Sequence, residues 1–152
     1  MRSGAVGLVV LVAASASAGI EHTILHGVSV GRVKAVVSVG WMTTGDTQQA
    51  YNLAGAIGTF CLLPGVWDRL DVPDLIAMAA PRACMVVGGT EDLLFPPLGQ
   101  REATRQIAEA FHWAGSPDLF RSYAPAKPHC YDQEIQEEAL AWFDRHLKPG
   151  KK

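Results

Sequence analysis

The sequence lacks the features that mark several specialised protein classes. Only 18% of its 152 residues are charged, the formal net charge is −2, and lysine and arginine are scattered apart from three lysines at the C-terminus. The sequence therefore has no basic patch of the kind that predicts a nucleic-acid-binding surface. Apolar residues make up 49% of the chain, which is typical of a globular protein rather than a disordered one. Because a domain usually has roughly 100–200 residues, we expect a single domain over residues 1–152.

Cysteine is also scarce. Cys61, Cys84 and Cys130 are odd in number and have no Cys-x-x-Cys spacing. This pattern argues against a disulfide framework and against a structural zinc site. We therefore expect no metal and no cofactor, and the free thiols favour a reducing compartment, the cytoplasm.

No apolar run is long enough to cross a membrane, but the one at residues 5–14 has two interpretations. It has about ten residues, too few to span a bilayer, so we expect no membrane partner. With Ala16-Ser17-Ala18 after it, residues 1–18 resemble a signal peptide cleaved after Ala18, which would make the protein secreted or periplasmic. The same residues also fit a buried strand, Val6 to Ala13, that leads into a tight turn and a helix.

The rest of the chain alternates between strand-like and helix-like patterns. The apolar, β-branched run Val33–Val39 is typical of a strand covered on both faces. Further strands are predicted at 83–87 and 119–123, and helices at 20–28, 71–79 (with Asp71 as N-cap), 99–114 and 132–147. Residues 41–67 are rich in Gly, Thr and Gln, and we expect a substrate-facing lid or loop there. This order predicts an α/β fold with three layers: a mainly parallel sheet of about four strands with helices on both faces.

Candidate catalytic side chains follow two of the predicted strands. The stretch at residues 85–95, MVVGGTEDLLF, begins as a short apolar strand that ends in two glycines. A loop with Glu91 and Asp92 follows within the same stretch, and His129 follows the next strand. The carboxyl ends of parallel strands are the usual place for chemistry. A histidine base needs a carboxylate to hold its tautomer, so we predict Asp92 as the acid and His129 as the base. Glu91 is the competing carboxylate, less favoured because adjacent side chains in a turn point in different directions.

A candidate nucleophile, Ser17, lies in the segment SASAG at residues 15–19. The nucleophile elbow of α/β enzymes is Gly-x-Ser-x-Gly, and here serine replaces the first glycine while the second remains. If Ser17 is the nucleophile, the backbone N–H of Ala18 is a candidate oxyanion donor. Cys130 beside the histidine is an alternative thiol nucleophile, although neighbouring residues rarely face each other as that role requires.

Several segments together resemble a known family. They are RVKA at 32–35, VGWM at 39–42, DVPDL at 71–75, APR at 80–82, GTEDLLFP at 89–96, and the histidine at 129 followed by AWF at 141–143. With them, residues 32–147 resemble the C-terminal half of α/β hydrolases of the dienelactone hydrolase and acetyl xylan esterase type.

The resemblance implies a truncated α/β-hydrolase fold and a serine esterase with the catalytic triad Ser17, Asp92 and His129. In such enzymes the serine lies about fifteen residues before the arginine of the first segment. Ser17 lies fifteen residues before Arg32, which favours it over the other serines nearby. The implied partner is a small-molecule ester with a short acyl chain.

Two other interpretations stay open. The chain could be an inactive hydrolase remnant that serves as a binding or assembly domain, or, if residues 1–18 are cleaved, a secreted fragment that begins at Gly19 without a serine elbow. The N-terminal half of the family's fold has no counterpart in the chain. The first strand would then have an exposed edge, which predicts a homodimer or a covering segment.

Overall fold

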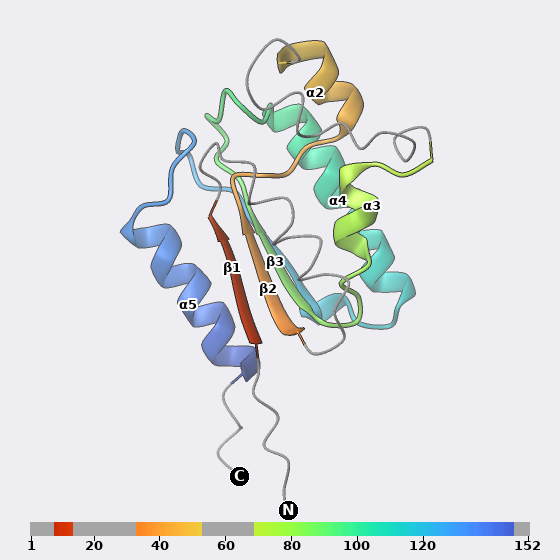
Figure 1. Ribbon diagram of the computed structural model, residues 1–152, viewed down its shortest axis with the longest axis vertical. Coiled ribbons are helices and arrows are strands. Elements are labelled where there is room, and N and C mark those ends of the chain that lie inside the picture. Colours follow the sequence, from red (N-terminus) through yellow and green to blue (C-terminus); the bar gives the residue numbers. More distant parts are fainter. Residues whose placement is uncertain (1–7, 14–32, 53–68, 148–152) are drawn as a thin grey trace, which may run out of the picture.

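The computed structural model describes residues 8–13, 33–52 and 69–147, which form a sheet flanked by helices (Figure 1). The strands are β1 (Leu8–Ala13), β2 (Val33–Val39), β3 (Ala83–Val87) and β4 (Phe120–Tyr123). The helices are α2 (Gly45–Asn52), α3 (Val72–Ala77), α4 (Pro97–Trp113) and α5 (Gln133–Leu147), with a short 3₁₀ helix, η1, at Pro117–Leu119. The four described strands are parallel and lie in the order β1-β2-β3-β4. The predicted α/β fold is thus confirmed.

The two central strands are buried on both faces, which explains their continuous apolar sequences. Successive side chains of a strand point to opposite faces. On β2, Val36 packs with α3 and α4, whereas Ala35, Val37 and Val39 pack with α5; β3 divides its side chains in the same way. Figure 1 shows α5 on one side of the sheet and α3 and α4 on the other. The three predicted layers are therefore present.

Helix α3 begins as the sequence predicts. The Asp71 carboxylate accepts a hydrogen bond from the Val72 backbone N–H at 2.6 Å, and the Asp74 carboxylate accepts one from the Asp71 N–H at 2.8 Å. This is a capping box, which satisfies backbone donors that the first helical turn leaves unpaired. The same Asp71 carboxylate accepts from the Gly45 N–H at 2.9 Å, so it also fixes the start of α2.

Two helix predictions need correction. Residues 45–52 were expected to be part of a lid or loop, but they form α2, and the rest of that segment lies outside the described residues. Its sequence, GDTQQAYN, has no apolar stripe at helical spacing, because its buried side chain is the polar Gln48. Helix α4 begins at Pro97, two residues earlier than expected, because proline fits the first helical position, where no N–H partner is needed.

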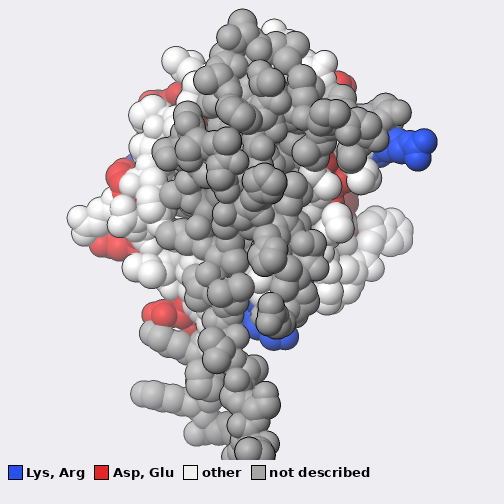
Figure 2. Space-filling model, in the orientation of Figure 1, with Lys and Arg blue, Asp and Glu red and all other residues white. Residues whose placement is uncertain are grey.

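Other predictions fall partly or wholly outside the described residues. The strand expected from Val6 is described from Leu8 onward, and the helix expected at 20–28 is not described. In the ranges that are described, no helix has the length and apolar character needed to cross a membrane. On the face drawn in Figure 2, the basic side chains of the described residues lie apart and form no continuous patch.

Candidate active site

Asp92 lies in the loop between β3 and α4, which we call the acid loop (residues 88–96). Its side chain is 1% exposed, and its Oδ1 accepts hydrogen bonds from the backbone N–H groups of Leu94, at 2.8 Å, and Phe95, at 3.2 Å. Such bonds to N–H groups two and three residues ahead are typical of an aspartate turn. They aim Oδ2 at His129, whereas the neighbouring Glu91 is exposed. The turn thus separates the two carboxylates as the sequence predicts.

His129 lies in the segment between β4 and α5, the base loop (residues 124–132). Its Nδ1 is 2.9 Å from Asp92 Oδ2, and its side chain is 22% exposed. One face of the imidazole stacks on Phe95, with ring centroids 5.9 Å apart and an angle of 27° between the planes. A carboxylate at Nδ1 favours the tautomer that carries the proton on Nδ1, which makes Nε2 the basic nitrogen.

The acid and base loops are joined through their main chains. The Thr90 N–H donates to the Pro125 carbonyl at 2.8 Å, and the Glu91 N–H donates to the Lys127 carbonyl at 3.1 Å. A side chain at Gly89 would not fit, because its Cβ would lie 2.0 Å from the Lys127 carbonyl oxygen. The two loops therefore continue the β3–β4 pairing beyond the sheet and bring the acid and the base together.

A cluster of charged side chains fixes the base loop to α5. Lys127 Nζ is 2.6 Å from Asp132 Oδ2 and 2.7 Å from Glu134 Oε2, and the Tyr123 hydroxyl donates to Glu134. The hydrogen bonds to Asp132 and Glu134 hold the pKa of Lys127 above its usual value. The hydrogen bond from Lys127 in turn holds the pKa values of both carboxyl groups below theirs.

Two residues that shape the site, Gln100 and Gly40, were not predicted from the sequence. The Gln100 side chain, 9% exposed, donates from Nε2 to the carbonyls of Gly89 at 3.1 Å and Phe95 at 2.5 Å, and so ties the two ends of the acid loop together. The sequence feature that could have pointed to Gln100 is its position: it is a polar residue on the buried face of α4, three positions before Ala103. Gly40 has φ +61°, and a Cβ there would lie 2.7 Å from His129 Cε1.

The other candidate site residues divide into two groups. Ser17 and Ala18 lie outside the described residues, so their predicted roles as nucleophile and oxyanion donor stay predictions. Cys130 is half-buried against the apolar side chains on the α5 side of the sheet. Cys84 is fully buried in β3, which raises the pKa of its thiol to about 12. Within the described ranges, no three His, Cys, Asp or Glu side chains gather as a metal site would require.

Comparison with solved structures shows which known fold the chain shares. No protein-family profile matches the sequence, and no curated protein matches it. A promiscuous CE15 esterase from the marine bacterial metagenome matches 91% of this chain with a TM-score of 0.65 and 16% identity. The chain has part of the α/β-hydrolase fold. A CE15 glucuronoyl esterase from Caldicellulosiruptor kristjansonii matches 82% of the chain with a TM-score of 0.60 and 19% identity.

A third solved structure, the esterase Pf2001 of Pyrococcus furiosus, matches 83% of this chain with a TM-score of 0.55 and 12% identity. The chain spans 42% of the metagenomic esterase, 39% of the glucuronoyl esterase and 49% of the Pyrococcus esterase. At these identities the likeness concerns the fold. The α/β-hydrolase fold that the sequence resemblance implied is confirmed for the part of it that this chain spans.

Proposed function

We propose that the chain is an ester hydrolase that acts through the triad Ser17, His129 and Asp92. The observation that carries the proposal is the distance of 2.9 Å between Asp92 Oδ2 and His129 Nδ1, with Asp92 buried and held by two backbone N–H groups. A buried carboxylate in this position fixes the histidine tautomer and stabilises the imidazolium that forms during catalysis.

The proposed reaction has two steps. In the first, Ser17 Oγ attacks the ester carbonyl carbon while His129 Nε2 accepts its proton, and the Ala18 N–H donates to the developing oxyanion. The tetrahedral intermediate collapses as the alcohol leaves with the proton from His129. In the second step His129 deprotonates a water molecule, which attacks the acyl-serine. The bond from the acyl carbon to Ser17 Oγ breaks, Oγ takes the proton back from His129, and the acid is released. Asp92 keeps its charge throughout and acts on the imidazole alone.

The comparisons support the class of reaction. All three of the solved structures described above are esterases, and they share this chain's fold. The sequence resemblance to dienelactone hydrolases and acetyl xylan esterases favours esters with short acyl chains. We therefore propose a small-molecule ester as substrate. The free thiols of Cys84 and Cys130 favour the cytoplasmic location that we propose.

Hydrolysis of p-nitrophenyl acetate by the wild type, Ser17→Ala, His129→Ala and Ser15→Ala tests the proposal. Loss of a triad member commonly lowers kcat by a factor on the order of 10³ or more, so we expect that loss for Ser17→Ala and His129→Ala. Ser15→Ala, the matched control two residues away, is expected to keep wild-type activity. Equal rates in all four proteins would refute the triad. Loss in His129→Ala alone would mean that another group is the nucleophile.

The intact mass of the mature protein tests the location and the nucleophile together. We expect a chain that still contains Ser17. A mature chain that begins at Gly19 would exclude both Ser17 as nucleophile and the cytoplasmic location.

One observation favours a second candidate function, a binding or assembly domain without catalysis. Among the described strands, β1 is paired only with β2, and an unpaired strand edge is a template for pairing with another chain. A folded, oligomeric wild type without measurable ester hydrolysis would favour this candidate over the esterase.

A further inference from the structure

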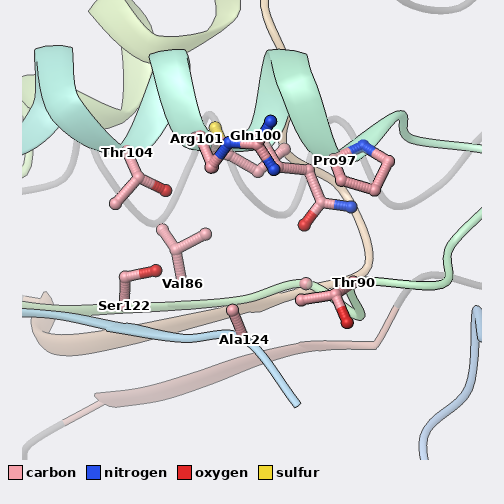
Figure 3. A pocket seen from close by; sticks show the side chains of 10 residues that line it. Val86, Thr90, Pro97, Gln100, Arg101, Thr104, Ser122 and Ala124 are labelled. Atoms are coloured by element: carbon pink, nitrogen blue, oxygen red, sulfur yellow. The ribbon is translucent and has the colours of Figure 1, made fainter. Parts of the chain in front are cut away.

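A pocket of about 240 Å³ lies between α4 and the strands β3 and β4 (Figure 3). Its strand side is formed in part by Val86 and Ser122, and its helix side by the α4 side chains of Arg101 and Thr104. Neither residue of the acid–base pair lines it. The pocket is therefore a separate feature on the face of the sheet opposite α5.

The pocket exists because the residues below α4 are small. The β4 side chains that face this helix are those of Phe120, which packs into the core, and Ser122; the next residue in that alternation is Ala124. On β3 the corresponding position after Val86 is Gly88. Ser122 and Ala124 leave open the space that larger side chains would fill beneath the first turns of α4. The space over Gly88 is occupied by the Gln100 side chain, whose Oε1 would lie 2.0 Å from an added Cβ.

Several polar groups that line the pocket have no hydrogen-bond or ion-pair partner among the described residues. The hydroxyls of Thr90, Thr104 and Ser122 and the guanidinium of Arg101 make no hydrogen bond or ion pair with another described residue. By contrast, Arg105, one turn further along α4, is 2.7 Å from Glu102 and 2.5 Å from Glu109.

The charged and apolar side chains that line the pocket indicate which class of ligand would fit it. Among the described residues that line the pocket, Arg101 is the only charged one, while Met42, Val86 and Pro97 supply apolar surface. The guanidinium group matches a carboxylate, with which it can form two parallel hydrogen bonds. A volume of about 240 Å³ corresponds to about eight water molecules at their share of liquid volume, which suits an acid with a compact apolar body.

We propose that this pocket is a binding site for a small monocarboxylate. Arg101 binds the carboxylate, the three hydroxyls supply further hydrogen bonds, and the apolar walls hold the body of the acid. The site does not depend on Ser17 or on ester hydrolysis, because none of the triad residues takes part.

Titration of the ¹⁵N-labelled protein with benzoate, followed by NMR, tests the site. We expect saturable shifts of the backbone amides of Thr90, Thr104 and Ser122, with a Kd on the order of a millimolar for a ligand of this size. Benzamide has nearly the same shape without the charge and is expected to bind at least tenfold more weakly. Equal affinities for the two compounds, or shifts confined to other parts of the molecule, would overturn the proposal.

Three variants sharpen the test. Arg101→Gln is expected to weaken benzoate binding about tenfold or more, because charge-assisted hydrogen bonds are lost. Arg105→Gln, the matched control on the same helix, is expected to bind as the wild type does. Ala124→Leu is expected to fill the pocket and abolish binding. Undiminished affinity in Arg101→Gln would refute the site even if the Ala124→Leu protein did not fold, since the Arg101 side chain is exposed and the variant should remain folded.

Discussion

The position of His129 depends on a residue that has no side chain. Gly40 has a backbone conformation that costs other residues about 1–2 kcal/mol, and an added Cβ would lie 2.7 Å from His129 Cε1. We expect Gly40→Ala to lower the free energy of unfolding by that amount in a urea titration. We also expect it to lower p-nitrophenyl acetate hydrolysis at least tenfold by displacing the imidazole.

Gly115 provides the matched control for Gly40. Its φ is +68°, but a Cβ there would meet nothing within 4 Å. Gly115→Ala should therefore show a similar loss of stability and retain its activity. If both variants were equally active, contact with Gly40 would not be what places the histidine.

Asp92→Asn tests whether the carboxylate sets the tautomer of His129. The asparagine oxygen can still accept from the Leu94 and Phe95 N–H groups, so we expect a loss of stability of only about 1–2 kcal/mol. Its NH₂ group would face Nδ1 as a donor and favour the tautomer protonated on Nε2, which cannot accept the serine proton. We expect the ¹⁵N shifts of the His129 ring to report this change and ester hydrolysis to fall by a factor on the order of 10³ or more. An unchanged tautomer would contradict the assigned role of Asp92.

Among the elements, the base loop is held to α5 by charges that can be titrated. Lys127 lies between Asp132 and Glu134, whose carboxyl pKa values are lowered from 3.8 and 4.5. A lowered carboxyl pKa means that the unfolded state binds more protons, so this stabilisation is present above about pH 4.5 and is lost as the pH falls through the folded-state values. The pKa of Lys127 is raised above 10.5, so its contribution is lost as the pH rises through the folded-state value.

We expect Lys127→Met to be less stable than the wild type at pH 7 and the difference to close as the pH falls below 4. Urea midpoints measured from pH 3 to pH 8 check this expectation. Lys34→Met removes an exposed lysine of β2 that has no ion pair among the described residues, and it should show little difference at any of these pH values. A difference for Lys127→Met that did not change with pH would rule out the ion pairs as its cause.

The same elements show how far the sequence alone could lead. Strands β2 and β3 were predictable because burial on both faces leaves a continuous apolar run. Asp92 was distinguishable from Glu91 because one turn cannot aim both side chains inward. Helix α2 was not predictable, since its buried residue is polar and hydrogen-bonds to the Leu94 carbonyl at 3.2 Å. The roles of Gln100 and Gly40 depend on contacts between residues far apart in the chain, which periodicity does not reveal.

For the whole molecule, the edge of the sheet at β1 is the feature with the clearest consequence. Strand β1 is paired only with β2 among the described strands, and we propose that its other edge pairs with a second copy. We expect a homodimer in which two β1 strands meet around a twofold axis. Analytical ultracentrifugation should give twice the monomer mass of 16.3 kDa, and a monomer at all concentrations would contradict this prediction.

The main-chain hydrogen bonds between the acid and base loops also bear on how such a protein can evolve. Bonds from Thr90 to Pro125 and from Glu91 to Lys127 depend on the backbone and not on the identity of those side chains. Drift at these positions therefore leaves the carboxylate and the imidazole paired, whereas the segment with the candidate nucleophile is encoded separately at the other end of the chain. A lineage could recombine or lose that segment and still inherit the paired Asp92 carboxylate and His129 imidazole.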